Sequence, residues 1–319
     1  MRETEYAFAV ARVRANEPAL LTADDIEQLI ASEDEKSTFR ILSDKGWDDP
    51  AEGKDIYDAE AEKAWDMISR SVPDPALLEA LIIGNDFANI KAAIKTVFSD
   101  IDSEKYIVKP YLFNPKETIR AVKENDFSIL PEYLSETADR AYHCISGDES
   151  GQSAEMIIDK ACLEKRLECS KNAQCPLLER IVSIHSLLAN IKIAKRCFAT
   201  GKEKQYALDS MCECGFIDNV ILLDRAYSGE EFKDYIKECG FPEIASESDG
   251  DFSTLEMKCD NLITDMIKIA RYDAFGPDPV VAYYYAKLAE IKNVRIILSA
   301  QAAGVPTETI RQRVRDMYV

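Results

Sequence analysis

One short sequence pattern recurs three times at an almost constant interval. Residues 87–91 read FANIK, residues 188–192 read LANIK, and residues 288–292 read LAEIK, which places the copies 101 and 100 residues apart. A fixed period of this kind indicates a repeated supersecondary unit, in which each copy occupies a corresponding place. The chain is therefore expected to contain three related units.

Two further landmarks keep the same period. Three aspartates, expected to begin the helix before the motif, are spaced by 101 residues: Asp58, Asp159 and Asp260. Three prolines, expected to break the chain just before the motif helix, have the same spacing: Pro75, Pro176 and Pro277. We therefore predict an N-terminal closing helix (1–19), three helical repeats (20–111, 112–212 and 213–303) and a C-terminal closing helix (304–319). The two closing helices are expected to pack together.

The local patterns are helical throughout. Asp74-Pro75 and Asn114-Pro115 each place a capping residue before a proline, which is typical of a helix start. The motif helices carry apolar residues at helical spacing, and we expect these to be buried: Phe87, Ile90, Ile94 and Val97 in the first, and Leu188, Ile191, Ala194 and Phe198 in the second. No strand pattern of useful length alternates. The sequence predicts an all-α protein with three similar helical sub-domains.

Composition excludes several functional classes. A net charge of -19 disfavours nucleic-acid binding, which needs a clustered positive surface. The longest apolar runs are far shorter than a membrane span of roughly 20 residues, and the N-terminus does not resemble a signal peptide, so we expect a cytoplasmic protein. The nine cysteines are expected to be free thiols of a reducing compartment. Cys212 and Cys214 would point to different faces of a helix.

Catalytic and cofactor motifs are not found. Two histidines leave little choice of general base or metal ligand, and neither a phosphate-binding glycine loop nor a nucleophile elbow occurs. We therefore expect no catalytic residues, no cofactor and no metal.

The repeated lysines Lys91, Lys192 and Lys292 allow two interpretations. They can flank the buried helix face and extend into solvent. They can also form three symmetric positive groups that line a central cavity. The sequence favours the first.

Several segments together resemble one family. These are residues 6–14 (YAFAVARVR), 20–22 (LLT), the helix expected over 24–30, the threefold motif helices and residues 290–295 (EIKNVR). The chain is similar to the C subunit of the archaeal and bacterial V/A-type ATPase, which is itself similar to the d subunit of the eukaryotic vacuolar ATPase. The resemblance covers the whole chain.

The resemblance implies a funnel of three helical sub-domains around a pseudo-threefold axis. It implies a rotor subunit without a catalytic site, a socket that couples the central shaft (D- and F-type subunits) to the membrane proteolipid ring during ATP-linked proton or sodium transport. Such a subunit would be cytoplasmic and peripheral to the membrane through the ring, with no membrane span of its own. The ring-facing surface is expected to carry exposed apolar residues rimmed by polar ones.

The positive residues of the end segments are the candidate partner interface, because a positive patch on an acidic protein can steer an acidic partner. These residues are Arg12, Arg14, Arg295, Arg311, Arg313 and Arg315. Ordinary surface arginines are an equally good interpretation. Reversing the charges of Arg311, Arg313 and Arg315 together is expected to weaken shaft binding.

Two other functions remain compatible with the sequence. One is a generic α-helical repeat adaptor that is unrelated to ion transport. The other is an all-α enzyme with an unrecognised site.

Overall fold

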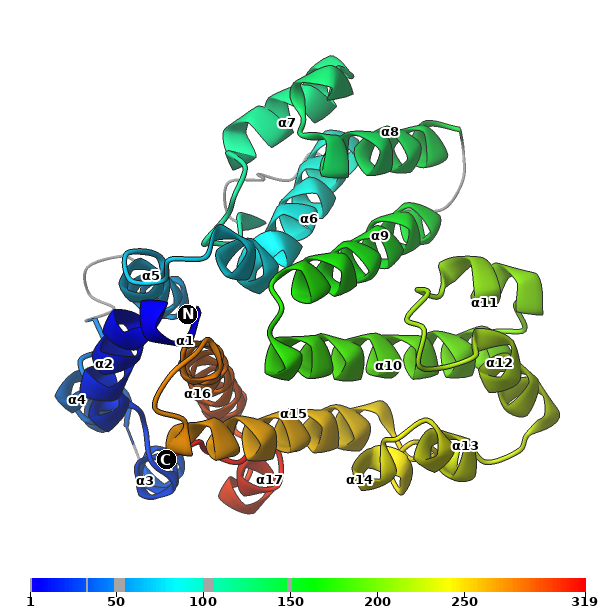
Figure 1. Cartoon of the computed structure of the whole chain (residues 1–319). Helices are drawn as coiled ribbons and strands as arrows, with labels where there is room; N and C mark the ends of the chain where they lie inside the picture. Colours follow the sequence, from blue (N-terminus) through cyan, green and yellow to red (C-terminus); the bar gives the residue numbers. More distant parts are fainter. Residues whose placement is uncertain (1, 33, 49–54, 100–105, 148–150) are drawn as a thin grey trace. The chain divides into compact units, whose positions relative to one another are not determined.

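The fold is helical wherever it is described (Figure 1). The computed structural model describes residues 2–32, 34–48, 55–99, 106–147 and 151–319, and within these ranges it contains helices and no strand. The prediction of an all-α protein is confirmed. The chain divides into two compact units, unit 1 (1–75 with 251–319) and unit 2 (76–250).

Unit 1 joins the two ends of the chain, and both termini lie in it (Figure 1). Its helices are α1 (Arg2–Glu5), α2 (Ala7–Asn16), η1 (Glu17–Ala19), α3 (Ala23–Ala31), α4 (Glu35–Asp44), α5 (Ile56–Ser69), α15 (Phe252–Ile269), η5 (Ala270–Tyr272), α16 (Asp278–Ala302) and α17 (Thr307–Arg311).

Unit 2 holds the middle of the chain. Its helices are α6 (Pro75–Ser99), α7 (Pro115–Glu124), η4 (Phe127–Ile129), α8 (Glu132–Ser146), α9 (Gly151–Asn172), α10 (Pro176–Ala199), α11 (Lys204–Ser210), α12 (Asn219–Ser228), α13 (Lys233–Glu238) and α14 (Pro242–Ala245).

The three motif copies lie on three long helices, α6, α10 and α16, of 25, 24 and 25 residues. Proline stands in the first turn of α10 and α16, where its missing N–H costs no helical hydrogen bond. The repeated aspartates are less regular than predicted. Asp58 lies in the first turn of α5, but Asp159 and Asp260 lie well inside α9 and α15, so the prediction that they begin those helices was wrong.

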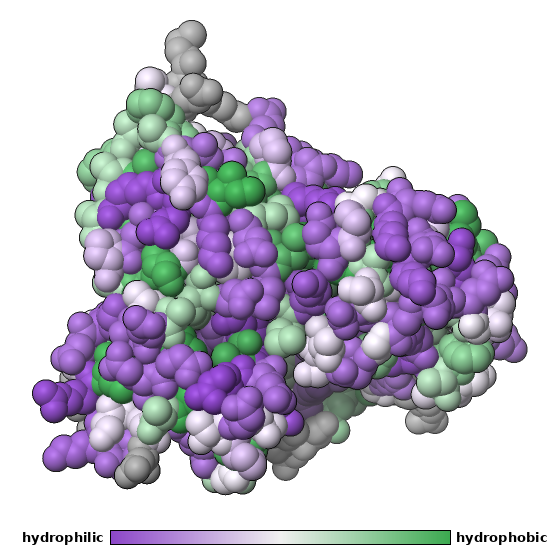
Figure 2. Space-filling view, turned by 90° about the horizontal axis from the view of Figure 1, so that it is seen from below, coloured by the Kyte–Doolittle hydropathy of each residue, from purple (hydrophilic) through white to green (hydrophobic). Residues whose placement is uncertain are grey.

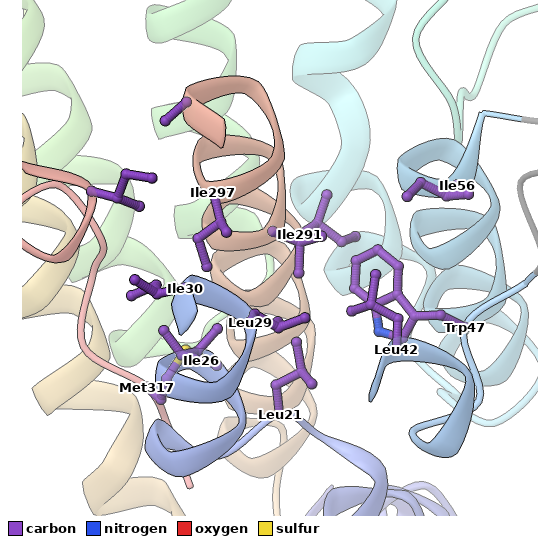
Figure 3. Close-up of a cluster of buried hydrophobic side chains, with 13 residues drawn as sticks. Leu21, Ile26, Leu29, Ile30, Leu42, Trp47, Ile56, Ile291, Ile297 and Met317 are labelled. Carbon is purple, nitrogen blue, oxygen red and sulfur yellow. The ribbon is translucent and has the colours of Figure 1, made fainter. Parts of the chain in front are cut away.

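The core of unit 1 lies where α3 and α4 pack on α16 (Figure 3). Leu21, Leu29 and Leu42 are at most 1% exposed, and they meet Ile297 and the indole of Trp47. The start of α3 is fixed by a capping box, since Thr22 Oγ1 accepts from Asp25 N–H at 3.2 Å while the Asp25 carboxylate accepts from Thr22 N–H at 2.8 Å. Residues from both ends of the chain therefore share one core.

The expected faces of α6 and α10 are mostly buried, with one error. Val97 on α6 and Leu188 on α10 are half-buried, and the remaining predicted core residues are buried: Phe87, Ile90 and Ile94 on α6, and Ile191 and Ala194 on α10. Phe198 was predicted to be buried but is 49% exposed, because α10 ends one residue later and the ring packs beside Tyr227 with centroids 5.5 Å apart.

The chain ends meet, but the last segment is not the helix that we predicted over 304–319. Only Thr307–Arg311 is helical, and residues 312–319 follow an irregular path. Tyr318 donates its hydroxyl to Glu17 at 2.9 Å, which ties the tail to the end of α2. The expected packing of the two ends is thus confirmed within unit 1, while the division into three repeats stays a prediction.

Candidate functional site

Each motif helix holds a later segment of the chain through one asparagine. Asn89 on α6 donates its amide to Val108 O at 3.1 Å and accepts from Val108 N–H at 2.7 Å. Asn190 on α10 does the same with Cys212, at 3.0 and 3.1 Å. An asparagine side chain carries both a donor and an acceptor, so it can satisfy both polar groups of one residue's backbone. We call these residues the anchor asparagines.

The third anchor asparagine is Asn293 on α16, which donates to Arg315 O at 2.9 Å and accepts from Arg315 N–H at 2.8 Å. The sequence repeat aligns Glu290 with Asn89 and Asn190. In the structure the residue equivalent to these asparagines is Asn293, three residues or nearly one helical turn after Glu290. Pro279 precedes Asn293 by the same 14 residues that separate Pro75 from Asn89. This constant proline spacing is the signal that sequence reasoning missed.

The anchor explains why the tail is not a helix. Arg315 N–H and C=O both bond to Asn293, and a backbone bound in this way cannot also make the hydrogen bonds of a continuing helix. By the same register, Arg295 lies two residues after its anchor, as Lys91 and Lys192 do after theirs. Arg295 is thus the counterpart of those lysines, rather than Lys292.

Glu290 serves a different purpose, at the centre of a buried ionic network. It is 0% exposed, accepts from Leu21 N–H at 2.7 Å and from Trp47 Nε1 at 3.1 Å, and pairs with Lys287 at 2.5 Å. Lys287 also contacts Glu60 at 2.9 Å. The network therefore fixes the segment before α3, and with it α4 and α5, onto α16.

Each buried carboxylate of this network has an ammonium partner. Lys63 continues the network to the solvent side, where its ammonium group contacts Glu60 at 2.5 Å and Asp48 at 2.9 Å, so the two buried carboxylates Glu60 and Glu290 face two ammonium groups and the partly exposed Asp48 adds a third carboxylate. Burial alone would lower the pKa of Lys287, but the charges of Glu290 and Glu60 outweigh burial and raise it. Lys287 is therefore held in its charged form.

Asp86 on α6 lies three residues before its anchor, as Glu290 does on α16. Its carboxylate accepts from Leu112 and Phe113 N–H, each at 3.0 Å, and from the Tyr133 hydroxyl at 2.7 Å. Burial raises the pKa of Asp86, and these three donors oppose that rise. In both units an acidic residue one turn before the anchor fastens a distant backbone segment.

Two of the six predicted interface arginines hold unit 1 together. Arg14 pairs with Glu17 at 2.5 Å and donates to the backbone oxygens of Ala270 and Asp273 at 3.0 and 2.9 Å. Arg315 is 8% exposed and binds Asp260 at 2.9 Å. Arg14 thus joins α2 to the segment after α15, and Arg315 joins the C-terminal tail to α15.

Of the other four arginines, Arg295, Arg311 and Arg313 are exposed, and Arg12 is half-buried. Arg12 donates to Ser71 Oγ at 2.7 Å, and Arg295 lies 4.6 Å from the Tyr57 ring centroid. Arg311 is exposed and pairs with Glu27 at 3.0 Å, so its charge is partly neutralised. Arg313 is exposed, and its guanidinium forms no ion pair with the residues that the structure describes. Arg313 is the most available positive group of the set.

Two of the three repeated lysines, Lys91 and Lys292, make ion pairs with the repeated aspartates. Lys91 on α6 pairs with Asp159 on α9 and lines, together with Phe87 and Cys162, a cavity of about 460 Å³ in unit 2. Lys292 pairs with Asp260 at 2.5 Å and is exposed. Lys292 thus extends from its helix to the surface, as the favoured interpretation predicted, whereas Lys91 is half-buried beside the cavity.

Three of the four exposed large apolar side chains of the described part of unit 1 gather between the end of α15 and the start of α16; the fourth is Phe8 on α2, which is 62% exposed. Ile269, Tyr272 and Phe275 are 70%, 88% and 54% exposed, and the polar residues Arg271 and Asp273 between them are exposed too. We call Ile269–Phe275 the apolar loop. Hydrophilic side chains predominate on the face shown in Figure 2, and hydrophobic residues form smaller patches among them.

Within the part of the chain that the structure describes, no group of three or more His, Cys, Asp or Glu side chains could hold a metal ion. None of the described helices is both long and apolar enough to cross a membrane.

Comparison with known proteins gives two findings. The family model described as ATP synthase (C/AC39) subunit matches residues 9–313. The C subunit of the V-type sodium ATPase of Enterococcus hirae is 22% identical over 329 aligned residues, which cover 98% of this chain and 99% of that protein. The similarity therefore extends over both chains from end to end.

Proposed function

This chain belongs to the ATP synthase (C/AC39) subunit family, and on that premise we propose that it is the rotor socket of a V-type ATPase. In this role it receives the central shaft, formed by D- and F-type subunits, and rests on the membrane proteolipid ring. It transmits torque between ATP turnover and proton or sodium transport. It has no active site of its own and is peripheral to the membrane through the ring.

One observation carries the proposal, namely that the family match spans residues 9–313, nearly the whole chain. An adaptor that had borrowed one helical repeat would match over one repeat only. The near-complete coverage favours retention of the whole socket.

Pairings within the two units support the proposed threefold funnel. In unit 2 the first motif helix α6 pairs through Lys91 with α9, which precedes the second motif helix. In unit 1 the third motif helix α16 packs on α5, which precedes the first, with Trp65 and Tyr284 at 6.4 Å and Lys287 and Glu60 at 2.9 Å. Each of these two motif helices thus packs on the helix that comes just before the following motif helix, where the first motif helix counts as following the third. A closed ring of three units requires this pairing.

The buried network suits a part that transmits torque. Close-packed interiors deform little and pass on strain, and ion pairs buried among them fix helices in one register. The Glu290–Lys287–Glu60 network gives α16 and α5 such a fixed register.

We assign the apolar loop as the candidate ring contact. Exposed apolar side chains rimmed by polar ones are typical of an interaction surface. Ile269, Tyr272 and Phe275 lie within one seven-residue segment together with exposed Arg271 and Asp273, whereas Phe8 is on α2 with the Arg12 guanidinium 5.8 Å from its ring centroid. Replacing all three by serine is expected to weaken binding to the detergent-solubilised proteolipid ring and to leave shaft binding unchanged. The matched control replaces Val220 and Ile221, which are exposed on α12 of unit 2. Equal loss with both variants would reject the assignment.

The shaft contact is assigned to Arg313. We no longer reverse Arg311, Arg313 and Arg315 together, as the sequence suggested. Arg315 is 8% exposed and pairs with Asp260, so reversing its charge would damage the fold. Arg313→Glu alone is expected to slow shaft binding at low salt, with the difference shrinking as salt screens the charge. Arg140→Glu, an exposed reversal on α8, is the control. Unchanged shaft affinity of the Arg313 variant at low salt would reject this contact.

The function itself is tested in membranes that lack the protein. The socket role requires that coupled ion pumping disappears while the soluble head still hydrolyses ATP, and that the full chain restores pumping. A chain that binds neither shaft subunits nor proteolipid ring in pull-down experiments would have the adaptor role instead.

A further inference from the structure

Unit 2 contains a cavity of about 460 Å³ that is lined mainly by α6 and α9. The two helices lie side by side (Figure 1) and run antiparallel. Near the start of α6, Glu79 Oε1 lies 3.6 Å from Cys169 Sγ, and near its end, Lys95 Nζ lies 2.6 Å from Glu155 Oε1. The cavity follows α6 from residue 84 to residue 96, a length of about 18 Å along the helix axis. It is therefore elongated in the direction of the two helices.

The contacts at the two ends of the cavity explain why it is there. Beside Gly84 the helices approach closely, since a Cβ added to this glycine would lie 3.2 Å from Arg166 Cδ. Toward the end of α6 the contacts are lysine–carboxylate pairs, which span the gap with long side chains. Between these contacts α6 presents Ala88 and Ala92, whose methyl groups leave space unfilled.

The lining is apolar inside and charged at the surface. Phe87 is 1% exposed and lines the cavity together with Ala88 and Ala92. The side chains of Lys95 and Asp159, by contrast, are 55% and 59% exposed. The volume lies within the range of about 300–1,000 Å³ of small-molecule sites, which combine apolar walls with a few polar groups that orient the ligand. The cavity therefore suits a molecule with an apolar body and a charged head.

The described lining residues favour a negative head. Among them, Lys91 and Lys95 are cationic and Asp159 is anionic, whereas Glu155, the partner of Lys95, does not line the cavity. The carboxylate partners of the two lysines are 59% and 41% exposed. Ion pairs at such exposure contribute little stability, so both lysines can bind another carboxylate at small cost.

We propose that this cavity binds a single-chain amphipathic carboxylate of the fatty-acid type. The carboxylate lies between Lys91 and Lys95, which are four residues apart and therefore share one side of α6. The chain extends along α6 past Phe87 toward Gly84, where the approach of α9 closes the cavity. Tyr106 lines the cavity and is 59% exposed, so its ring is available to cover the chain. All of these groups belong to unit 2, and the site does not depend on the proposed socket role.

Three ligands with one chain and different heads test the choice of charge. Decanoate, decan-1-ol and decylamine are titrated into the full-length reduced protein, and binding is measured by calorimetry. Decanoate is expected to bind at least about tenfold more tightly than decan-1-ol, because a hydrogen bond to a charged group is stronger than one between neutral groups. Decylamine is expected to bind most weakly, because Lys91 and Lys95 repel its ammonium group.

Cys162 reports where the ligand binds, because it lines the cavity and is half-buried. Decanoate at about ten times its Kd is expected to slow the alkylation of Cys162 by N-ethylmaleimide about tenfold, as peptide mapping would show. Cys144 and Cys239 are the internal controls, since they are also half-buried and do not line the cavity. Cys212 and Cys214 are buried in the non-helical segment between α11 and α12, so the expectation that they point to different helix faces does not apply.

Two substitutions with matched controls separate the charge from the space. Lys95→Gln is expected to weaken decanoate binding about tenfold and to leave decan-1-ol binding unchanged, whereas Lys123→Gln, at an exposed residue of α7, changes neither. Ala92→Phe fills the cavity and is expected to abolish binding of both ligands. Ala161→Phe, at a half-buried residue of α9 that does not line the cavity, preserves it.

The proposal is overturned if decanoate does not bind at about 1 mM, or binds no more tightly than decan-1-ol. Tighter binding of decylamine would mean that Asp159 selects the head, which contradicts a carboxylate ligand. Equal protection of Cys144, Cys162 and Cys239 would place the ligand outside this cavity. These readouts are made on the wild-type chain, so none of them depends on the folding of a variant.

Discussion

Replacing Lys287 by methionine removes one charge from the buried network and keeps most of the side-chain volume. The Lys287 side chain is 8% exposed, and its partners Glu60 and Glu290 are 3% and 0% exposed. The substitution leaves two buried carboxylates to share the remaining donors. The expected result is a large loss in the free energy of unfolding of unit 1.

The magnitude follows from what each carboxylate retains. Removing one partner of a buried ion pair costs about 3–5 kcal/mol. Glu290 keeps its bonds from Leu21 N–H and Trp47 Nε1, and Glu60 keeps Lys63 at 2.5 Å. We therefore expect the lower end of the range, about 3 kcal/mol.

The two tryptophans make the assay specific to one unit. Trp47 and Trp65 are the only tryptophans of the chain, and both lie in unit 1. Trp47 is 4% exposed and contacts Glu290 directly. Urea unfolding followed by tryptophan fluorescence therefore reports on unit 1, without a contribution from tryptophans of unit 2.

Lys292→Met is the matched control, because it removes the same group from the same helix. Its ion pair with Asp260 is exposed, with 45% of the lysine side chain accessible, so the expected loss is under about 1 kcal/mol. The reasoning fails if the two variants lose the same free energy. It also fails if the double variant Lys287→Met, Glu60→Gln loses a further amount of about 3 kcal/mol of unfolding free energy. Neutralising Glu60 removes one of the two buried negative charges, so the double variant should recover part of the loss.

Three further predictions concern the anchors and the dependence on pH. Asn293→Ala leaves the buried N–H and C=O of Arg315 without their partner, which is expected to cost about 3 kcal/mol and to speed hydrogen exchange of the tail; slow exchange there would contradict the anchor role. Partial burial would raise the pKa of Asp25, but Lys45 and Thr22 lower it, so its stabilising effect is present above pH of about 4 and fades as pH falls; Asp25→Asn should flatten the stability curve from pH 5 to 3. Lys287 has the opposite pH dependence, because its pKa is raised in the folded protein. Its contribution to the free energy of unfolding is complete below its ordinary pKa of 10.5 and is lost as pH rises through the higher folded pKa. The stabilities of the wild type and Lys287→Met should therefore approach each other as pH rises beyond 10.5.

Local sequence signals predicted the helices well, because their causes are local. The Asn114-Pro115 start of α7 and the proline at the start of α10 act within one turn, and the structure shows both. The three motif helices were found from the repeat alone. Phe198 was misplaced because helical spacing defines a face but does not say where a neighbouring helix stops covering it.

The roles of individual polar residues were harder to predict, because they depend on contacts far apart in the sequence. Arg315 looks like a surface arginine beside Arg313 in the sequence, yet it is 8% exposed because Asp260 and Asn293 hold it. Glu290 matched the anchor position by spacing, but its partners are Leu21 and Trp47, more than 240 residues earlier. No local pattern distinguishes an exposed charge from a buried one of this kind.

The placement of both chain ends in unit 1 bears on how the proposed socket would carry load. Residues 1–75 and 251–319 are joined by the Glu290 network, by Arg14 to the Ala270 and Asp273 backbone, and by Tyr318 to Glu17. Force applied to α16 is therefore passed to α3 and α5 through buried contacts as well as along the backbone. A rotor part loaded by torque needs such cross-connections, because a helix held only through its chain neighbours could be pulled away from one end. Substitutions in the network should on this reasoning uncouple ATP turnover from ion transport under load before they prevent assembly.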